Sequence, residues 1–293
     1  MGYLPLEELA KLDAIEVEDY ETAVEEIYRL GWTDGLPVII PTPRLVQRIL
    51  DYLGRRPEEV IGIIPPYQGV ATTEKIAVNC VMAGCLPEYV PVVLAALSAM
   101  LKERFNLNGV QATTHSAAPL LIVSGAVVER LGFNSRDNAF AGGCRANAAV
   151  GRAIRLILWN IGGGRAGELD KAVLGHPGKW SHCIAEEKEW NPWGPLHADR
   201  GFNPEESCVT VFAGESPHHI MTGGGYSSPD KILTVLADSM ATLGNSTMQA
   251  GGDMVLVVGP LVAKHLADKG YSRAGLRDAL IERARKPVRL MKA

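Results

Sequence analysis

The chain has 293 residues, of which 47% are hydrophobic and 21% are charged, and its formal net charge is −4. This is ordinary globular composition, with enough length for one large domain or two lobes. A mildly acidic chain without a block of Lys and Arg argues against nucleic-acid binding. Its apolar runs are broken before the roughly 20 residues that a membrane-spanning helix needs, so we expect no membrane partner.

The cysteines and the first residues bear on the cellular setting. Five cysteines, an odd number in a long chain, do not suggest a disulfide scaffold. Residues 1–21 are acidic and lack the apolar core of a secretory signal. Leu6 stands where a myristoylation signal needs Ser or Thr. We therefore expect a reduced, cytoplasmic protein.

Taken in chain order, apolar periodicity, capping residues and glycine or proline breaks predict helices that alternate with short strands. The predicted helices cover 18–31, 43–53, 73–84, 87–105, 144–161, 228–243, 260–270 and 272–285. The predicted strands cover 38–40, 60–64, 110–114, 120–124, 208–213 and 254–258. This alternation is typical of an α/β or mixed α+β fold. We predict one compact two-lobed domain, with an N-terminal lobe over 1–164 that holds the site and a C-terminal lobe over 165–293.

The stretch 72–160 places reactive residues at three successive joints between apolar elements, and Cys85 lies at the first. It precedes a helix that opens at Pro87, and a thiol near a helix N-terminus can have a lowered pKa. Cys85 is therefore a candidate nucleophile or soft metal ligand. The alternative is a small buried residue in a turn between helices. Cys80 falls inside an apolar helix and is predicted to be a core residue.

His115 lies at the second joint, after the predicted strand 110–114. Ligand sites in α/β folds form at strand ends. A histidine there fits a general base, because its reference pKa is roughly 6.5. The alternative is a histidine that is hydrogen-bonded to loop carbonyls.

The third joint is Gly143, which precedes a largely apolar helix. The free amides at the helix start, with Arg145 and Asn147, could hold a carboxylate or phosphate. The segment is neither GxGxxG nor a Walker A loop, so it implies no nucleotide. Cys144 is a second candidate thiolate, and the alternative is a glycine hinge with Arg145 in solvent. We predict that Cys85, His115 and Arg145 line one cavity.

A long polar stretch over 165–206 contains three tryptophans and three histidines. We expect it to cover the cavity, because loops this long in compact domains are commonly functional. His176 and His218 are predicted to contact the substrate. Six side chains could supply metal ligands, namely His176, His182, Cys183, His197, His218 and His219. Their spacings match no zinc pattern, so we predict no metal site, and no motif identifies a cofactor.

Three short segments resemble bacterial proteins that are associated with the UGSC (seleno)protein family. They are WTDGLP at 32–37, MAGCLPEY at 82–89 and QATTH at 111–115. The UGSC motif itself is absent, since no Gly-Ser-Cys occurs in the chain. The resemblance implies a thiol- or redox-linked enzyme system, with or without a second protein subunit, and it does not identify a reaction.

These features together predict a cytoplasmic enzyme that acts on a small anionic molecule by thiol and histidine chemistry. Cys85 or Cys144 would be the reactive thiol, His115 the acid–base group, and Arg145 and Asn147 the anchor. One alternative is the substrate-binding subunit of a thiol-dependent oxidoreductase complex. Another is a non-catalytic small-molecule binding protein. In each case we expect an oligomer.

Overall fold

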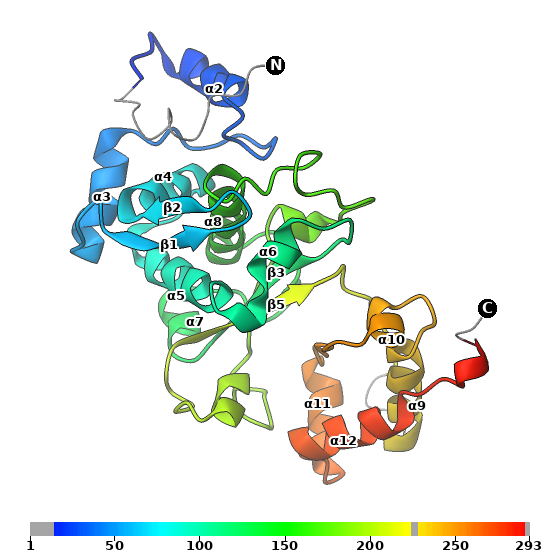
Figure 1. Cartoon of the computed structure of the whole chain (residues 1–293). Helices are drawn as coiled ribbons and strands as arrows, with labels where there is room; N and C mark the ends of the chain where they lie inside the picture. Colours follow the sequence, from blue (N-terminus) through cyan, green and yellow to red (C-terminus); the bar gives the residue numbers. More distant parts are fainter. Residues whose placement is uncertain (1–14, 224–227, 291–293) are drawn as a thin grey trace. The chain divides into compact units, whose positions relative to one another are not determined.

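A computed structural model describes residues 15–223 and 228–290 (Figure 1). Their contacts divide them into two units. The first holds the described residues up to Glu186 together with Asp199–Ser216, and the second holds Glu187–Ala198 together with the described residues from Pro217 onward. Helices dominate both units, and the first also carries two small sheets. The predicted mixture of helices and short strands is confirmed.

The helices of the first unit begin and end at residues that favour those positions. They are α2 (Tyr20–Arg29), α3 (Pro43–Leu53), α4 (Thr73–Ala83), α5 (Val90–Met100), α6 (Leu107–Gln111), α7 (Val127–Arg130) and α8 (Arg145–Asn160). Thr72 caps α4, because its side chain accepts a hydrogen bond of 3.3 Å from the amide of Lys75. Gly84 ends α4 with a left-handed φ of 88°. α4 and α5 both pack against α8, and the buried side chains of these three helices form much of the apolar core.

Two sheets complete the first unit. Their strands are β1 (Val60–Ile64), β2 (Gly69–Thr72), β3 (Ala118–Ser124), β4 (Cys183–Ala185) and β5 (Cys208–Gly214). β1 and β2 form an antiparallel pair, while β3 lies between a parallel β4 and an antiparallel β5. In the register, Ala118 faces Gly214 and Leu121 faces Cys183. The residues just before β3, just before β4 and just after β5 therefore lie close together, at the same end of the three strands.

The predicted strand over 110–114 is wrong, and the correction moves His115. Asn106 caps α6, since its side chain accepts a hydrogen bond of 3.3 Å from the amide of Gly109. α6 therefore includes Val110 and Gln111, the first two residues of the predicted strand. His115 consequently lies in the loop between α6 and β3, and does not end a strand.

Other predicted elements also differ. Residues 38–40 are irregular, because the amide of Ile39 donates to the carbonyl of Met82 at the end of α4 (3.2 Å) and not to a strand. Residues 254–258 alternate between half-buried and exposed, but pair with no strand in the described part of the chain. The single helix predicted over 87–105 is divided into a 3-10 turn, α5 and a second 3-10 turn. The short 3-10 helices are η1 (Pro87–Tyr89), η2 (Glu103–Phe105), η3 (Pro177–Lys179), η4 (Leu196–Arg200) and η6 (Val288–Leu290).

The second unit is a small helical bundle. Its helices are α9 (Pro229–Met240), α10 (Ser246–Ala250), α11 (Pro260–Asp268) and α12 (Arg273–Arg283). α9, α11 and α12 share a core that includes Ile232, Leu266 and Leu280. Trp193, from the segment 187–198, packs against this core and donates its indole N–H to the carbonyl of Tyr271 at 2.8 Å.

This division differs from the predicted lobes over 1–164 and 165–293. A boundary after residue 164 would separate β3 from both of its neighbours, β4 and β5. The amide of Lys171 also donates to the carbonyl of Thr113 at 3.0 Å, which ties the polar stretch to the first unit. Strand pairing therefore holds most of the polar stretch in the first unit, and only its middle segment folds with the second.

No single helix among the described residues is both long enough and apolar enough to cross a membrane. One pair, Thr73–Ala83 with Pro87–Met100, reaches the required length and composition together, but is bent by 118°.

Candidate functional site

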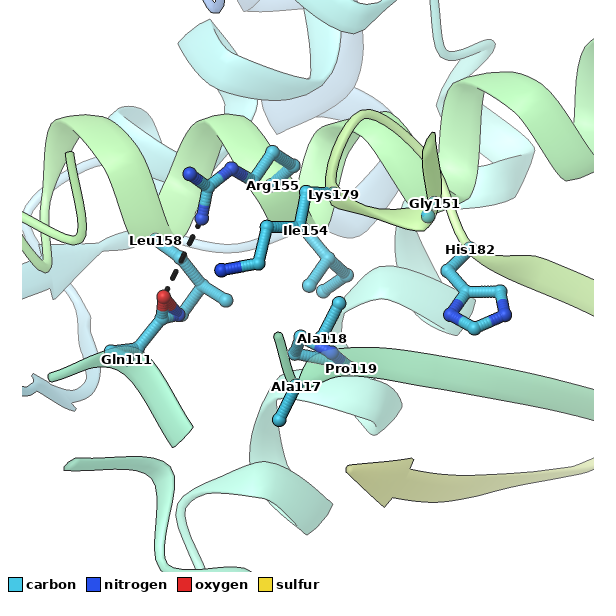
Figure 2. Close-up of a pocket in the computed structure, with 11 residues that line it drawn as sticks. Gln111, Ala117, Ala118, Pro119, Gly151, Ile154, Arg155, Leu158, Lys179 and His182 are labelled. Atoms are coloured by element: carbon cyan, nitrogen blue, oxygen red, sulfur yellow. Dashed lines mark hydrogen bonds between the residues drawn. The ribbon is translucent and has the colours of Figure 1, made fainter. Parts of the chain in front are cut away.

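Several polar side chains of the first unit gather beside the start of β3. A cavity there is bordered by α6, α8, the start of β3 and the segment that leads into β4 (Figure 2). Its polar lining side chains are Gln111, Arg155, Lys179 and His182. We call it the Lys179 pocket. Its volume is about 10 Å³, which is about the space of one water molecule.

Two cations share one carboxylate at this pocket. The Nζ atom of Lys179 lies 2.7 Å from both carboxylate oxygens of Asp170, and Nη2 of Arg155 lies 3.5 Å from Oδ2. The Asp170 side chain is 4% exposed, that of Arg155 11% and that of Lys179 15%. Burial lowers the pKa of Arg155, and the charge of Asp170 opposes that effect. The three side chains carry two positive charges and one negative charge, and the charge of Asp34, which pairs with Arg152, also favours charged Arg155. Buried charge is costly without a counter-charge, so this excess of positive charge favours an anion.

A hydrogen-bond donor at the same end of the pocket is also unused. Arg155 donates from Nη1 to Oε1 of Gln111 at 3.5 Å, while Nε2 of Gln111 has no partner within residues 15–223 and 228–290. Gln111 is only 2% exposed. In Figure 2 the amide of Gln111 lies beside the amine of Lys179 and the guanidinium of Arg155. This end of the pocket is therefore rich in donors and poor in acceptors.

His182 lies towards the other end of the pocket in Figure 2. Its side chain is buried, and neither ring nitrogen has a hydrogen-bond partner in the described part of the chain. The ring contacts that of His176 edge to face, with centroids 5.6 Å apart, and lies 6.4 Å from the ring centroid of Phe140. Burial, assisted by the charge of His176, lowers the pKa of His182 to about 4. His182 is therefore a neutral imidazole at pH 7, with one donor and one acceptor available.

The two histidines are held close by Gly178. The amide of Gly178 donates to Nδ1 of His176 at 3.1 Å. A Cβ atom at position 178 would lie 2.5 Å from Cε1 of His176 and 2.9 Å from Nδ1 of His182, so only glycine fits without displacing both rings. Burial, followed by the charge of Lys179, lowers the pKa of His176. The GHPGK segment at 175–179 thus supplies the lysine and packs both imidazoles.

A second cavity, of about 80 Å³, contains the predicted thiol. Cys85 lines it together with Pro87, Arg48 and Arg145. Apolar side chains of α3, α4 and the segments beside them complete the wall. We call it the Cys85 cavity. Cys85 itself is buried, and its thiol donates to the carbonyl of Ala149 at 3.4 Å.

The structure therefore brings Cys85 and Arg145 to one cavity, but not His115. His115 is half exposed, and its Nε2 atom lies 2.6 Å from Oε1 of Glu215. It lines neither the Lys179 pocket nor the Cys85 cavity. His218 belongs to the second unit and is exposed there.

Several side chains of the predicted anion cradle at the start of α8 are hydrogen-bonded within the protein. Nε of Arg145 donates to the carbonyl of Gly84 at 3.0 Å. The Asn147 side chain is buried, accepts from the amide of Asn134 at 2.8 Å, and donates to the carbonyls of Asn134 (3.1 Å) and Cys183 (3.3 Å). The thiol of Cys144 donates to the carbonyl of Gly132 at 3.1 Å, and Gly143 is exposed. Asn147 has thus no free donor to offer a ligand.

The predicted cover over 165–206 borders the Lys179 pocket through Gly178, Lys179 and His182, and contributes no residue to the Cys85 cavity. The sequence patterns did not mark Gln111, Arg155, Asp170 or Lys179 as site residues. Arg155 follows Arg152 by three residues in a helix with many apolar residues, and this charged pair is the signal that could have marked it.

Metal ligation has no support within the part of the chain that the structure describes. No group of three or more His, Cys, Asp or Glu side chains there is placed to hold an ion. His176 and His182 are neighbours, while Cys183 points into the core cluster of the first unit.

Comparison of the chain with protein-family models, with curated proteins and with solved structures finds no match.

Proposed function

We propose that the protein is an enzyme that binds a small carboxylate or phosphate compound at the Lys179 pocket and exchanges a proton with it through His182. One observation carries this proposal: Arg155 and Lys179, both largely buried, share the single carboxylate of Asp170. An anionic ligand would balance the second cation, and the free amide of Gln111 would donate a hydrogen bond to it.

The closed pocket is too small for an organic anion, so binding requires the segment 175–179 to move. Gly175 begins this segment with a left-handed φ of 64°, a conformation that glycine adopts without strain. Opening would withdraw Lys179 from Asp170. Closing over the ligand would return the ammonium group and exclude water, which strengthens the electrostatic attraction.

His182 is suited to accept a proton from the bound molecule. It is neutral at pH 7 and has an acceptor nitrogen without a partner in the described residues. A nearby anion favours the protonated imidazole, so the pKa of His182 should rise when the pocket is filled. The base would therefore become stronger in the complex than in the free protein.

A non-catalytic binding protein, or a binding subunit of a larger enzyme, would use the same anion site. The two functions differ in whether His182 changes its protonation when ligand binds. The reduced, cytoplasmic setting and an oligomeric or two-subunit assembly remain predictions from the sequence.

Isothermal titration calorimetry with acetate, phosphate and sulfate tests the anion site. Lys179→Met should weaken binding at least about tenfold, equivalent to about 1.4 kcal/mol. The fold should persist, because Arg155 and Asp170 remain as a balanced pair. Lys171→Met is the matched control, since Lys171 lies in the same stretch but is exposed. Equal binding by wild type and Lys179→Met, or equal weakening by the control, would contradict the proposal.

The proton transfer is tested separately. Titrations in two buffers of different ionisation enthalpy measure the protons taken up on binding. Wild type should take up protons at pH 6 to 7, and His182→Gln should bind the anion without doing so. Binding without proton uptake in the wild type would favour the non-catalytic alternative.

A further inference from the structure

The C-terminal turn of α4 brings two thiols together. The amide of Cys85 donates to the carbonyl of Cys80, and the amide of Gly84 donates to the carbonyl of Val81, each at 2.9 Å. With Gly84 left-handed, these two bonds form a Schellman motif. In this motif the residue after the left-handed glycine commonly contacts the helical residue whose carbonyl accepts from its amide. Here those residues are Cys85 and Cys80, and a hydrogen bond joins their thiols.

The surroundings give the two thiols different access. Cys80 is fully buried, whereas Cys85 lines the Cys85 cavity. A hydrogen bond with the Cys85 thiol, followed by burial, raises the pKa of Cys80 well above its ordinary value. A small molecule in the cavity would therefore contact Cys85 and would not reach Cys80, which Cys85 shields.

The rest of the cavity leaves Cys85 within reach of a small polar oxidant. Arg48 and Arg145 border the same space and supply hydrogen-bond donors beside the sulfur. The cavity volume of about 80 Å³ admits hydrogen peroxide but not a bulky disulfide. Both thiols are free in the structure.

We propose that Cys80 and Cys85 form a peroxide-sensitive dithiol that closes reversibly to a disulfide. The Cys85 thiolate attacks one oxygen of hydrogen peroxide, the O–O bond breaks, and a sulfenic acid and hydroxide form. The Cys80 sulfur then attacks the Cys85 sulfur, which expels water as the S–S bond forms. Overall, two thiols lose two hydrogens and peroxide yields two water molecules. A dithiol reductant reverses the oxidation by thiol–disulfide exchange. This site is separate from the Lys179 pocket and does not depend on the function proposed there.

The reaction can be read from one peptide. Trypsin releases residues 76–102 as a single fragment that contains both cysteines. After mild peroxide treatment of the native protein, this fragment should be lighter by two hydrogen atoms and should resist alkylation. Treatment with a dithiol should restore both alkylation sites. Oxidation of Met82 would instead add an oxygen atom, so the two events are distinguishable by mass.

Single variants assign the roles. Cys85→Ser should abolish the loss of alkylation at Cys80, while Cys80→Ser should trap a sulfenic acid at Cys85 that dimedone labels. Cys144, in the separate tryptic fragment 137–145, is the internal control. A wild-type fragment that keeps both thiols while Cys144 is oxidised would overturn the proposal. A disulfide that joins the two fragments would overturn it equally, and both readouts use wild-type protein.

Discussion

Replacing Asp170 by Asn should be among the most damaging single changes in the first unit. The substitution keeps the shape of the side chain but removes the only carboxylate that contacts Lys179 and Arg155 in the described structure. Breaking a buried ion pair by removing one partner costs about 3–5 kcal/mol, because a charge is left without compensation. Arg155 keeps its contacts with Gln111 and the ring of Trp159, and Lys179 is partly exposed, so we expect a loss of about 3 kcal/mol, the lower end.

Urea denaturation at low ionic strength measures this loss as a change in the free energy of unfolding. The double variant Asp170→Asn/Lys179→Met should recover much of it, because only one buried cation then lacks a partner. Sulfate should stabilise Asp170→Asn more than wild type, since the anion replaces the missing charge. A loss below about 1 kcal/mol, or a double variant whose loss equals the sum of the singles, would refute the shared-carboxylate reasoning.

Three further predictions concern the same unit. Between pH 6.5 and pH 4, His182 is protonated in the unfolded state but not in the folded state, so the free energy of unfolding should fall as the pH is lowered through this window. In a urea titration at several pH values, His182→Gln should lack about 3 kcal/mol of this fall. Gly178→Ala should destabilise the protein by about 1–3 kcal/mol, because its methyl group overlaps both imidazoles, and a thermal or urea unfolding curve unchanged from wild type would contradict this. Asn147→Ala should cost about 1–3 kcal/mol in urea denaturation, because the amide of Asn134 and two carbonyls lose their partner, whereas an anchor role would instead appear as weaker anion binding with stability retained.

The elements with strong local signals could be predicted from the sequence. Pro43 and Gly54 bound α3, and Ser272 caps α12, so the chain itself marks where these helices begin or end. The run at 60–64 became β1 with the predicted bounds. The apolar run after Asn106 was misjudged, because a capping side chain and an apolar pattern favoured different structures there.

The candidate site was harder to predict, because its parts are distant in the sequence. Arg155, Asp170 and Lys179 meet only because β4 pairs with β3 and carries the preceding loop back over α8. No local pattern contains that pairing. Cys85 and Arg145 were placed together from their positions at helix ends, and the packing of α4 against α8 brings those ends to one cavity. His115 has no such connection, since its loop carries it to Glu215.

The path of the chain has a consequence for how the protein can be synthesised and shortened. It leaves the first unit after Glu186, contributes residues 187–198 to the second, returns at Asp199, and leaves again after Ser216. During synthesis, the first unit can be complete once Ser216 has emerged, while Trp193 must wait for Tyr271 and the helices around it. In a chain that stops at residue 216, Trp193 and its segment would therefore lack the helices against which they pack. To express the first unit alone, residues 187–198 must be removed as well.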